Sequence, residues 1–402
     1  MAINAPAILG EAPTFAHPLG IVRPLLPSLA SIQDRLERAM VSGQLTNNGR
    51  YVRELEEKLI DYFGVKHVIP VSNATVGLMI LVRALGEHGE VILPSFTFSA
   101  TPHAIVWAGL KPVFADILPD TYTLDPASAV QLVNAKTVAI MGVHIYGHPC
   151  EIDELQVLAD RHQLPLMFDA AHAFGSRYKE RRVGSFGQAE VFSFHATKIF
   201  PVGEGGAITT DDDELAERLR LLRTFGDPGD ENTHLPGLNA KMQEFNALIG
   251  LENLKVIDQH VEHRRAVAGV IQSELADVPG LDFQTQRPYV YSNYQNLSLL
   301  VDDDLFGLNR DQLFLALKAE NVNARKYFYP PLHQHDAYTN MPDLVRHELP
   351  VTEDISDRIL CLPIYSDMSE SLAEDMCTII KRVHTHAHAI LKYLHSEAED
   401  FK

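Results

Sequence analysis

Cysteine is scarce in this chain of 402 residues, which holds only Cys150, Cys361 and Cys377. Their odd number and wide spacing exclude a disulfide framework and a CxxC motif. The sequence also lacks an apolar run long enough to span a bilayer, and its first residues lack the basic and apolar regions of a secretory signal. We therefore expect reduced thiols and a cytoplasmic protein with no membrane segment.

Positive charge is also in deficit. Lysine and arginine together number 34 against 53 aspartate and glutamate residues, which gives a formal net charge of -19 at neutral pH. Such an acidic chain is unsuited to the phosphate backbone of a nucleic acid, so we expect no nucleic-acid partner. Local N–H groups and a few cations would have to bind any anionic small molecule.

The sequence does contain a regular alternation of apolar strands and helices from Val65 onward. Short, continuously apolar runs between amphipathic segments predict an α/β fold with a mostly parallel sheet covered by helices on both faces. The length indicates more than one core. We predict an N-terminal arm over residues 1–22, a large domain over 23–264 and a smaller α+β domain over 265–402.

Two long helices are expected in the C-terminal half. One runs from Ala240 past Val261 and links the two domains, and the other runs from Ser369 to about His395.

Two functional groups follow neighbouring apolar runs. Asp169 ends the run Leu164-Pro-Leu-Met-Phe168, and Lys198 ends the run Phe192-Ser-Phe-His-Ala-Thr197. A buried carboxylate needs a compensating cation, and a lysine that forms a Schiff base must be partly neutral and firmly held. The pair suits pyridoxal phosphate, whose pyridinium takes an acid partner and whose aldehyde takes a lysine. Considered singly, Asp169 could cap a turn and Lys198 could be a surface lysine.

Residues near other predicted strand ends could complete such a site. The run Ser72-Asn-Ala-Thr75 enters a helix, whose first N–H groups could bind a phosphate, although the same pattern is an ordinary helix cap. Ser193 is a second candidate for the phosphate. Phe98 could stack on the cofactor ring or be a core residue, and His172 could contact the ring or be a hydrogen-bonded structural histidine.

Two other patterns indicate no further site. His384, His386 and His388 have no acidic or cysteine partner nearby, so an exposed polar face is expected there and no metal site. Gly203-Glu-Gly-Gly206 is not a GxGxxG fingerprint, which disfavours a dinucleotide-dependent enzyme.

With these residues in this order, the chain resembles the DegT/StrS family of nucleotide-sugar aminotransferases, which have the type I pyridoxal-phosphate fold. The resemblance extends from about Arg23 to about Lys392. It rests on the motifs Ser72-Asn-Ala-Thr75, Pro94-Ser-Phe-Thr-Phe98, Val143-His-Ile-Tyr-Gly147, Asp169-Ala-Ala-His172, Ser193-Phe-His-Ala-Thr-Lys198, Gly203-Glu-Gly-Gly206, Gly237-Leu-Asn-Ala-Lys-Met242 and Tyr329-Pro-Pro-Leu-His333.

The resemblance implies a role for each site residue. Lys198 would form the Schiff base with pyridoxal phosphate and Asp169 would face the pyridinium nitrogen. His172 would approach the phenolic oxygen, and Phe98 would stack on the ring. The phosphate would be held by Ala74, Thr75 and Ser193, and by Asn239 of a neighbouring subunit, which makes the expected active unit a homodimer with shared sites.

The resemblance also implies the reaction. An amino group would pass from glutamate or glutamine to a nucleotide-linked keto-deoxysugar, and the run from Gly237 to Met242 favours a dTDP-4-keto-6-deoxyhexose. Relatives that dehydrate sugars carry histidine at the lysine position, so Lys198 favours transamination. Three alternatives stay open: a 3-keto sugar or cyclitol aminotransferase, a pyridoxal-phosphate-dependent sugar dehydratase, and a non-catalytic regulatory protein that binds the cofactor.

Candidate substrate contacts are less specific than the cofactor contacts. Lys241 could meet the diphosphate as a point charge. Each candidate could equally be an ordinary loop or surface residue. The candidates are Thr46, Asn47, Lys241, Tyr329 and His333.

Overall fold

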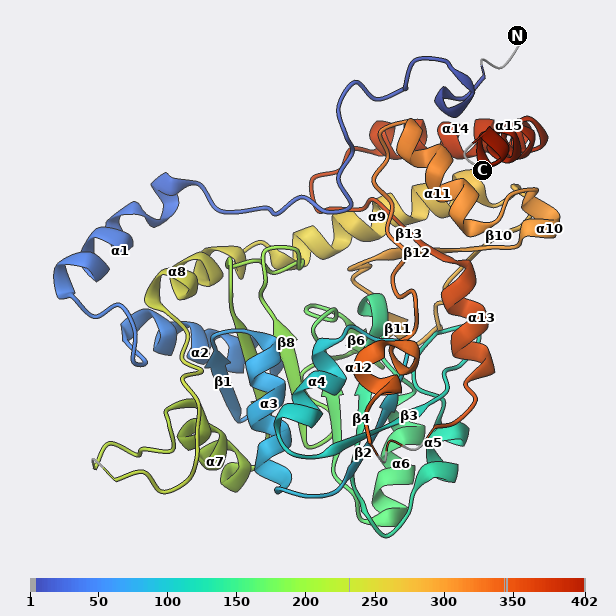
Figure 1. The fold of residues 1–402 in the computed structure, drawn as a ribbon. Coiled ribbons are helices and arrows are strands. Elements are labelled where there is room, and N and C mark those ends of the chain that lie inside the picture. The colour runs from blue at the N-terminus through green and yellow to red at the C-terminus, as the bar shows by residue number, and fades with distance from the viewer. Residues whose placement is uncertain (1–4, 231, 343, 345, 401–402) are drawn as a thin grey trace.

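The computed structural model describes residues 5–400 apart from 231, 343 and 345, and its centre is a seven-stranded mixed sheet (Figure 1). All strands of this sheet run in the same direction except β9, which is antiparallel to both of its neighbours. In their order across the sheet the strands are β1 (His67–Val71), β9 (Gly206–Thr210), β8 (Ala189–Ser193), β5 (Leu166–Asp169), β4 (Thr137–Val143), β2 (Glu90–Pro94) and β3 (Lys111–Ala115).

Helices cover both faces of this sheet, as its continuously apolar strands require. On one face lie α3 (Ala74–Leu85), α4 (Ala100–Trp107) and α7 (Asp213–Arg223). On the other lie α2 (Arg50–Phe63), α5 (Pro126–Leu132), α6 (Ile152–His162) and α8 (Glu244–Asn253), and α1 (Leu29–Ser42) packs against α8. The predicted α/β class is confirmed.

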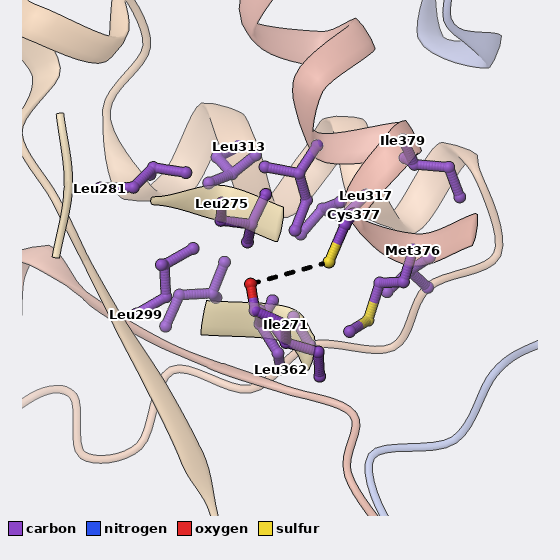
Figure 2. Close-up of a cluster of buried hydrophobic side chains, with 14 of the residues drawn as sticks. Ile271, Leu275, Leu281, Leu299, Leu313, Leu317, Leu362, Met376, Cys377 and Ile379 are labelled. Atoms are coloured by element: carbon purple, nitrogen blue, oxygen red, sulfur yellow. Dashed lines mark hydrogen bonds between the residues drawn. The ribbon is translucent and has the colours of Figure 1, made fainter. Parts of the chain in front are cut away.

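The C-terminal part of the chain encloses a second group of buried side chains, the C-terminal core (Figure 2). Leucine, isoleucine and valine dominate it, and Cys377 lies among them with its thiol near the Ile271 carbonyl. Around it stand β10 (Leu281–Phe283), β12 (Leu297–Val301), β13 (Ile359–Leu362), α9 (Ile257–Leu275), α11 (Arg310–Ala319), α14 (Glu370–Thr385) and α15 (Ala387–Asp400).

Short elements complete the chain. A small antiparallel sheet joins β11 (Val290–Tyr291), β6 (Arg177–Tyr178) and β7 (Arg181–Arg182). The remaining helices are α10 (Asp303–Phe306), α12 (Asp336–Thr339) and α13 (Pro350–Arg358). Among the residues placed by the structure, no helix is both long and apolar enough to cross a membrane.

Helix α9 contributes to both cores. Ile257 and Val261 pack in the core beneath the large sheet, whereas Val267 and Ile271 belong to the C-terminal core. The domain boundary predicted at residue 265 falls between these two groups. Residues 1–4 of the predicted arm and residues 401–402 of the predicted C-terminal domain lie outside the described residues.

Both long helices predicted from the sequence are wrong in their extent. The first is interrupted at residues 254–256 because α8 packs against α1 and α2 while α9 packs against α14, and one straight helix cannot serve both surfaces. The second is interrupted at His386, which has left helical geometry and whose Nδ1 lies 2.9 Å from the Arg382 carbonyl.

Candidate active site

The carboxyl ends of the central parallel strands meet the N-terminus of α3 at a cavity of about 540 Å³. Strand register places these ends side by side, because Val143 pairs with Asp169 and Ser193 pairs with Gly206. The structure brings together seven of the residues predicted for cofactor binding: Ala74, Thr75, Phe98, Asp169, His172, Ser193 and Lys198.

Asp169 is a buried carboxylate with a donor on each oxygen. Its Oδ2 accepts a hydrogen bond from the Thr101 hydroxyl at 2.7 Å, and its Oδ1 accepts the Ala171 N–H at 3.0 Å. The Thr101 hydroxyl also lies 2.9 Å from that of Thr97. Burial raises the pKa of Asp169, while Thr101, Ala171 and the charge of Lys198 act in the opposite direction. A cationic partner in the cavity would therefore be strongly favoured.

Lys198 stands in a loop that the distant residue Gln295 holds at two points. The Gln295 side chain accepts the Ile199 N–H at 2.8 Å and donates to the Thr197 carbonyl at 3.0 Å. Gln295 is itself buried, and its N–H donates to the Asn293 side chain at 2.8 Å. The amine is therefore carried by a loop whose backbone is fixed on both sides of residue 198.

The pKa values of Lys198 and His172 both lie below their ordinary ranges. Burial lowers the pKa of the Lys198 amine to about 8, although Asp169 acts against this shift. Burial and the charge of Lys198 hold the pKa of His172 well below its usual value, so this ring is neutral. Its Nδ1 accepts the Tyr146 N–H at 3.3 Å, which leaves the proton on Nε2 as a donor.

The opposite end of the cavity offers N–H and hydroxyl donors. Asn73 caps α3 by accepting the Val76 N–H at 2.9 Å, and the N–H groups of Ala74 and Thr75 belong to the first turn, which has no intrahelical acceptors. A Cβ on Gly206 would lie 2.9 Å from the Ala74 nitrogen, so only glycine lets β9 approach this helix end so closely. The Ser193 hydroxyl lies beside it and accepts the His195 N–H at 3.3 Å.

Aromatic side chains form a further wall. Phe98 is 56% exposed, lines the cavity, and has its ring 6.4 Å from that of Phe328. The Phe328 ring also lies nearly parallel to those of His172 and Tyr146. The Tyr146 hydroxyl donates to the Tyr327 carbonyl. This bond connects the aromatic wall to the segment that follows β4.

Four predicted residues lie in one region of the surface and do not line the cavity. Asn239 is exposed, and the Lys241 amine lies 4.7 Å from the centre of the Phe225 ring. Thr46 and Asn47 are also exposed, in the turn between α1 and α2. This turn reaches the same region, because the Leu45 carbonyl accepts the Glu244 N–H at 3.0 Å.

Tyr329 and His333 are predicted substrate residues that also lie outside the cavity. The Arg310 guanidinium carbon lies 4.4 Å from the centre of the Tyr329 ring, and both residues line a separate pocket beside α11. His333 bridges Ser95 and Glu353, with its Nδ1 2.8 Å from the Ser95 hydroxyl and its Nε2 3.0 Å from the Glu353 carboxylate. His333 therefore braces the segment that carries Phe98.

Sequence reasoning missed Thr101, Asn293, Gln295 and Phe328. Gln295 contacts a loop that lies 96 residues away in the sequence, so no local pattern could have identified it. Asn293 donates to the carbonyls of His172 and Phe174, again across more than a hundred residues. Thr101 lies four residues after Thr97, and this spacing was the only signal available.

The donor set fits pyridoxal phosphate. A buried carboxylate suits a pyridinium nitrogen, a lysine of lowered pKa suits an aldehyde, and the donors at the start of α3 and at Ser193 suit a phosphate. The described residues include no group of three or more His, Cys, Asp or Glu side chains that could hold a metal ion. His384 and His386 instead lie within hydrogen-bond distance of backbone carbonyls.

Comparisons with known proteins agree with this geometry. Residues 29–381 match the model of the DegT/DnrJ/EryC1/StrS aminotransferase family. The dTDP-4-amino-4,6-dideoxy-D-glucose transaminase of Escherichia coli is 37% identical over 88% of this chain and 95% of its own, and that of Shigella dysenteriae is 36% identical over 91% and 99%. The crystal structure of DesI with its TDP-sugar product superposes with a TM-score of 0.89 and 40% identity over 96% of this chain and 97% of that one.

Replacing Thr101 with valine should weaken cofactor binding without unfolding the protein. The change removes a hydrogen bond to a charged group, worth about 1.5–3 kcal/mol, which corresponds to a tenfold or greater loss of affinity. Thr101→Ser keeps the hydroxyl and should retain most of the affinity. Fluorescence titration of the apoprotein with pyridoxal phosphate measures both.

Thr121→Val is the matched control, because Thr121 and Thr123 form a similar buried hydroxyl pair, 2.9 Å apart, that does not line the cavity. Equal losses of affinity in Thr101→Val and Thr121→Val would show that Thr101 has no special effect on the site.

The pKa of about 8 predicts how attachment of the cofactor depends on pH. Only the neutral amine is a nucleophile, so the rate at which the apoprotein forms its covalent link to the cofactor should rise about tenfold per pH unit below pH 8 and level off above it. Stopped-flow absorbance measures the rate. A rate still rising near pH 10 would indicate a lysine of ordinary pKa.

Proposed function

Because the chain belongs to the DegT/DnrJ/EryC1/StrS aminotransferase family, we propose that it transfers an amino group to C4 of a dTDP-linked 4-keto-6-deoxyhexose. The protein is a pyridoxal-phosphate-dependent sugar aminotransferase. The substrate rests on the relatives named as dTDP-4-amino-4,6-dideoxy-D-glucose transaminases and on DesI with its TDP-sugar product. The observation that carries the proposal is that Lys198 and Asp169 line one cavity together with the start of α3.

Four residues would bind the phosphate and the ring nitrogen of the cofactor. The N–H groups of Ala74 and Thr75 and the Ser193 hydroxyl would bind its phosphate, and the ionised Asp169 carboxylate would keep its ring nitrogen protonated. When bound, pyridoxal phosphate supplies an electron sink for breaking a C–H bond next to an amine, and it carries the amino group from donor to acceptor.

Lys198 would move the proton in each half of the reaction. With a pKa of about 8, its Nζ can take up and release a proton near neutral pH, which suits a general base that later acts as the acid. The fixed backbone at Thr197 and Ile199 limits the arc over which Nζ can move. His172, which is neutral and has Nε2–H free to donate, would hydrogen-bond to the phenolic oxygen.

The proposed amino donor is glutamate or glutamine, and the proposed compartment is the cytoplasm. All three cysteines are free and buried, which agrees with a reducing compartment.

We propose a homodimer in which each subunit completes the other's cavity. Asn239, Lys241, Thr46 and Asn47 lie on one region of the surface outside their own cavity, as residues that serve a neighbour would. Large apolar side chains are exposed in and next to this region, and such exposure marks an interface. They are Leu29, Met40, Val41, Leu45, Phe225 and Leu238.

A panel of dTDP-, UDP- and GDP-linked keto sugars tests the substrate. With glutamate or glutamine as donor, the dTDP-4-keto-6-deoxyhexose should gain an amino group, detected as a mass shift of the product. In the absence of the sugar, the donor alone should shift the absorbance of the holoenzyme to that of pyridoxamine phosphate.

Lys198→Ala is the control for this panel and should lose both the covalently attached cofactor and the turnover. Full turnover in this variant would exclude Lys198 as the catalytic residue. A product that has lost water and gained no nitrogen would identify a dehydratase, and amination of a 3-keto sugar alone would replace the C4 assignment.

Mixing two inactive variants tests the shared site. Lys198→Ala disables a subunit's own cavity, whereas Asn239→Ala is expected to impair the neighbour's. If the subunits of an equal mixture exchange at random, about half of the dimers contain one subunit of each variant. Each mixed dimer holds one intact site of two, so about a quarter of wild-type activity should return. Activity no higher than the mean of the separate variants would mean that Asn239 serves its own subunit or none.

A further inference from the structure

The N-terminal arm, residues 5–22, precedes the residues that match the family and is fastened along the C-terminal core (Figure 1). Ile8, Leu9 and Phe15 pack against this core, and Leu19 is buried in it. The Leu19 N–H donates to the Asn321 carbonyl at 2.7 Å, and the Leu19 carbonyl accepts the Asn323 N–H at 3.0 Å. The arm is therefore an ordered part of the fold over these residues.

A buried carboxylate fixes the first half of the arm. Glu320, whose side chain is fully buried, accepts the Ala7 N–H and an Arg382 N–H on Oε1, at 2.8 and 2.7 Å. Its Oε2 accepts the N–H and the hydroxyl of Thr14, both at 2.8 Å. Three of these four hydrogen bonds come from the arm and would be lost if it left, so Glu320 acts as a latch.

The second half of the arm ends at the active-site cavity. Ile21 and Val22 both line it, and the Ile21 carbonyl accepts the Ile364 N–H at 3.3 Å. Ile21 packs against the buried cluster that contains Val143, Ile145 and Phe328, which also line the cavity. The arm thus contributes apolar surface to the same cavity that Asp169 and Lys198 line.

We propose that the arm is a selectivity element, in which the Glu320 latch holds Ile21 and Val22 where they receive the methyl group of a 6-deoxy sugar. This inference rests on the proposed function. A 6-deoxyhexose carries one apolar substituent, the methyl group on C5, whereas an ordinary hexose carries a hydroxymethyl group there. An apolar wall leaves that extra hydroxyl without a partner, and such pockets discriminate by up to about a hundredfold.

The test compares two amines in the reverse half-reaction of the holoenzyme, dTDP-4-amino-4,6-dideoxyglucose and its 6-hydroxy counterpart. The wild type should prefer the methyl sugar in kcat/KM, measured from the change in cofactor absorbance, and in Kd, measured by calorimetry. Ile21→Ala should reduce this preference by about tenfold, mainly by weakening the methyl sugar. Glu320→Gln should also reduce the preference for the methyl sugar. It should in addition make the arm, up to Val22, accessible to proteolysis.

Leu372→Ala is the matched control, since Leu372 packs on the C-terminal core from α14, outside the arm, and does not line the cavity. It should leave the preference unchanged. An unchanged preference in Ile21→Ala, with both sugars still reacting, would overturn the selectivity role and leave the proposed function standing. A wild type that reacts with neither sugar would overturn both.

Discussion

The buried carboxylate of Asp169 is the constraint on which the site depends. A charge at the end of a central strand is tolerated only if hydrogen bonds and a cation offset its lost hydration. The protein supplies the hydrogen bonds from Thr101 and Ala171, and the charge of Lys198 favours the ionised form. Burial of the lysine in the same cavity lowers its own pKa. The same buried cavity thus holds the Asp169 carboxylate, which a cation would stabilise, and the Lys198 amine, which is partly neutral.

The positions of these groups are set by segments far apart in the chain. Gln295 and Asn293, which precede β12, hold the backbone at Lys198 and at His172. His333 reaches across to Ser95 and steadies the segment that carries Phe98. The C-terminal half of the chain therefore does more than cover the cavity, because its side chains hold the loops on which the reacting groups stand.

Much of the sheet, and of the set of residues that line the cavity, could be predicted from sequence, since both follow local rules. Apolar runs such as Leu166–Phe168 identify buried strands, and a polar residue at the end of such a run points to the ligand-binding edge. The helix breaks near Leu254 and at His386 could not be predicted, because tertiary packing overrides a continuous helical pattern there. The Gln295 and Glu320 contacts span 96 and 313 residues, and no periodicity encodes such pairings. Tyr329 and His333 stay predicted substrate contacts, and in this structure Tyr329 stacks against Arg310 while His333 braces a loop.

The Glu320 latch also has a consequence for the order in which the molecule is assembled. The acceptor of the Ala7 N–H is synthesised 313 residues after Ala7 itself, and Arg382 on the same carboxylate comes later still. Contacts so distant in sequence carry a high loop-closure cost and form late in folding. The large sheet can form while the arm is still unattached, because its strands all lie between residues 67 and 210. The arm thus docks only after Glu320 and Arg382 have been made, and the wall at Ile21 closes later than the large sheet forms.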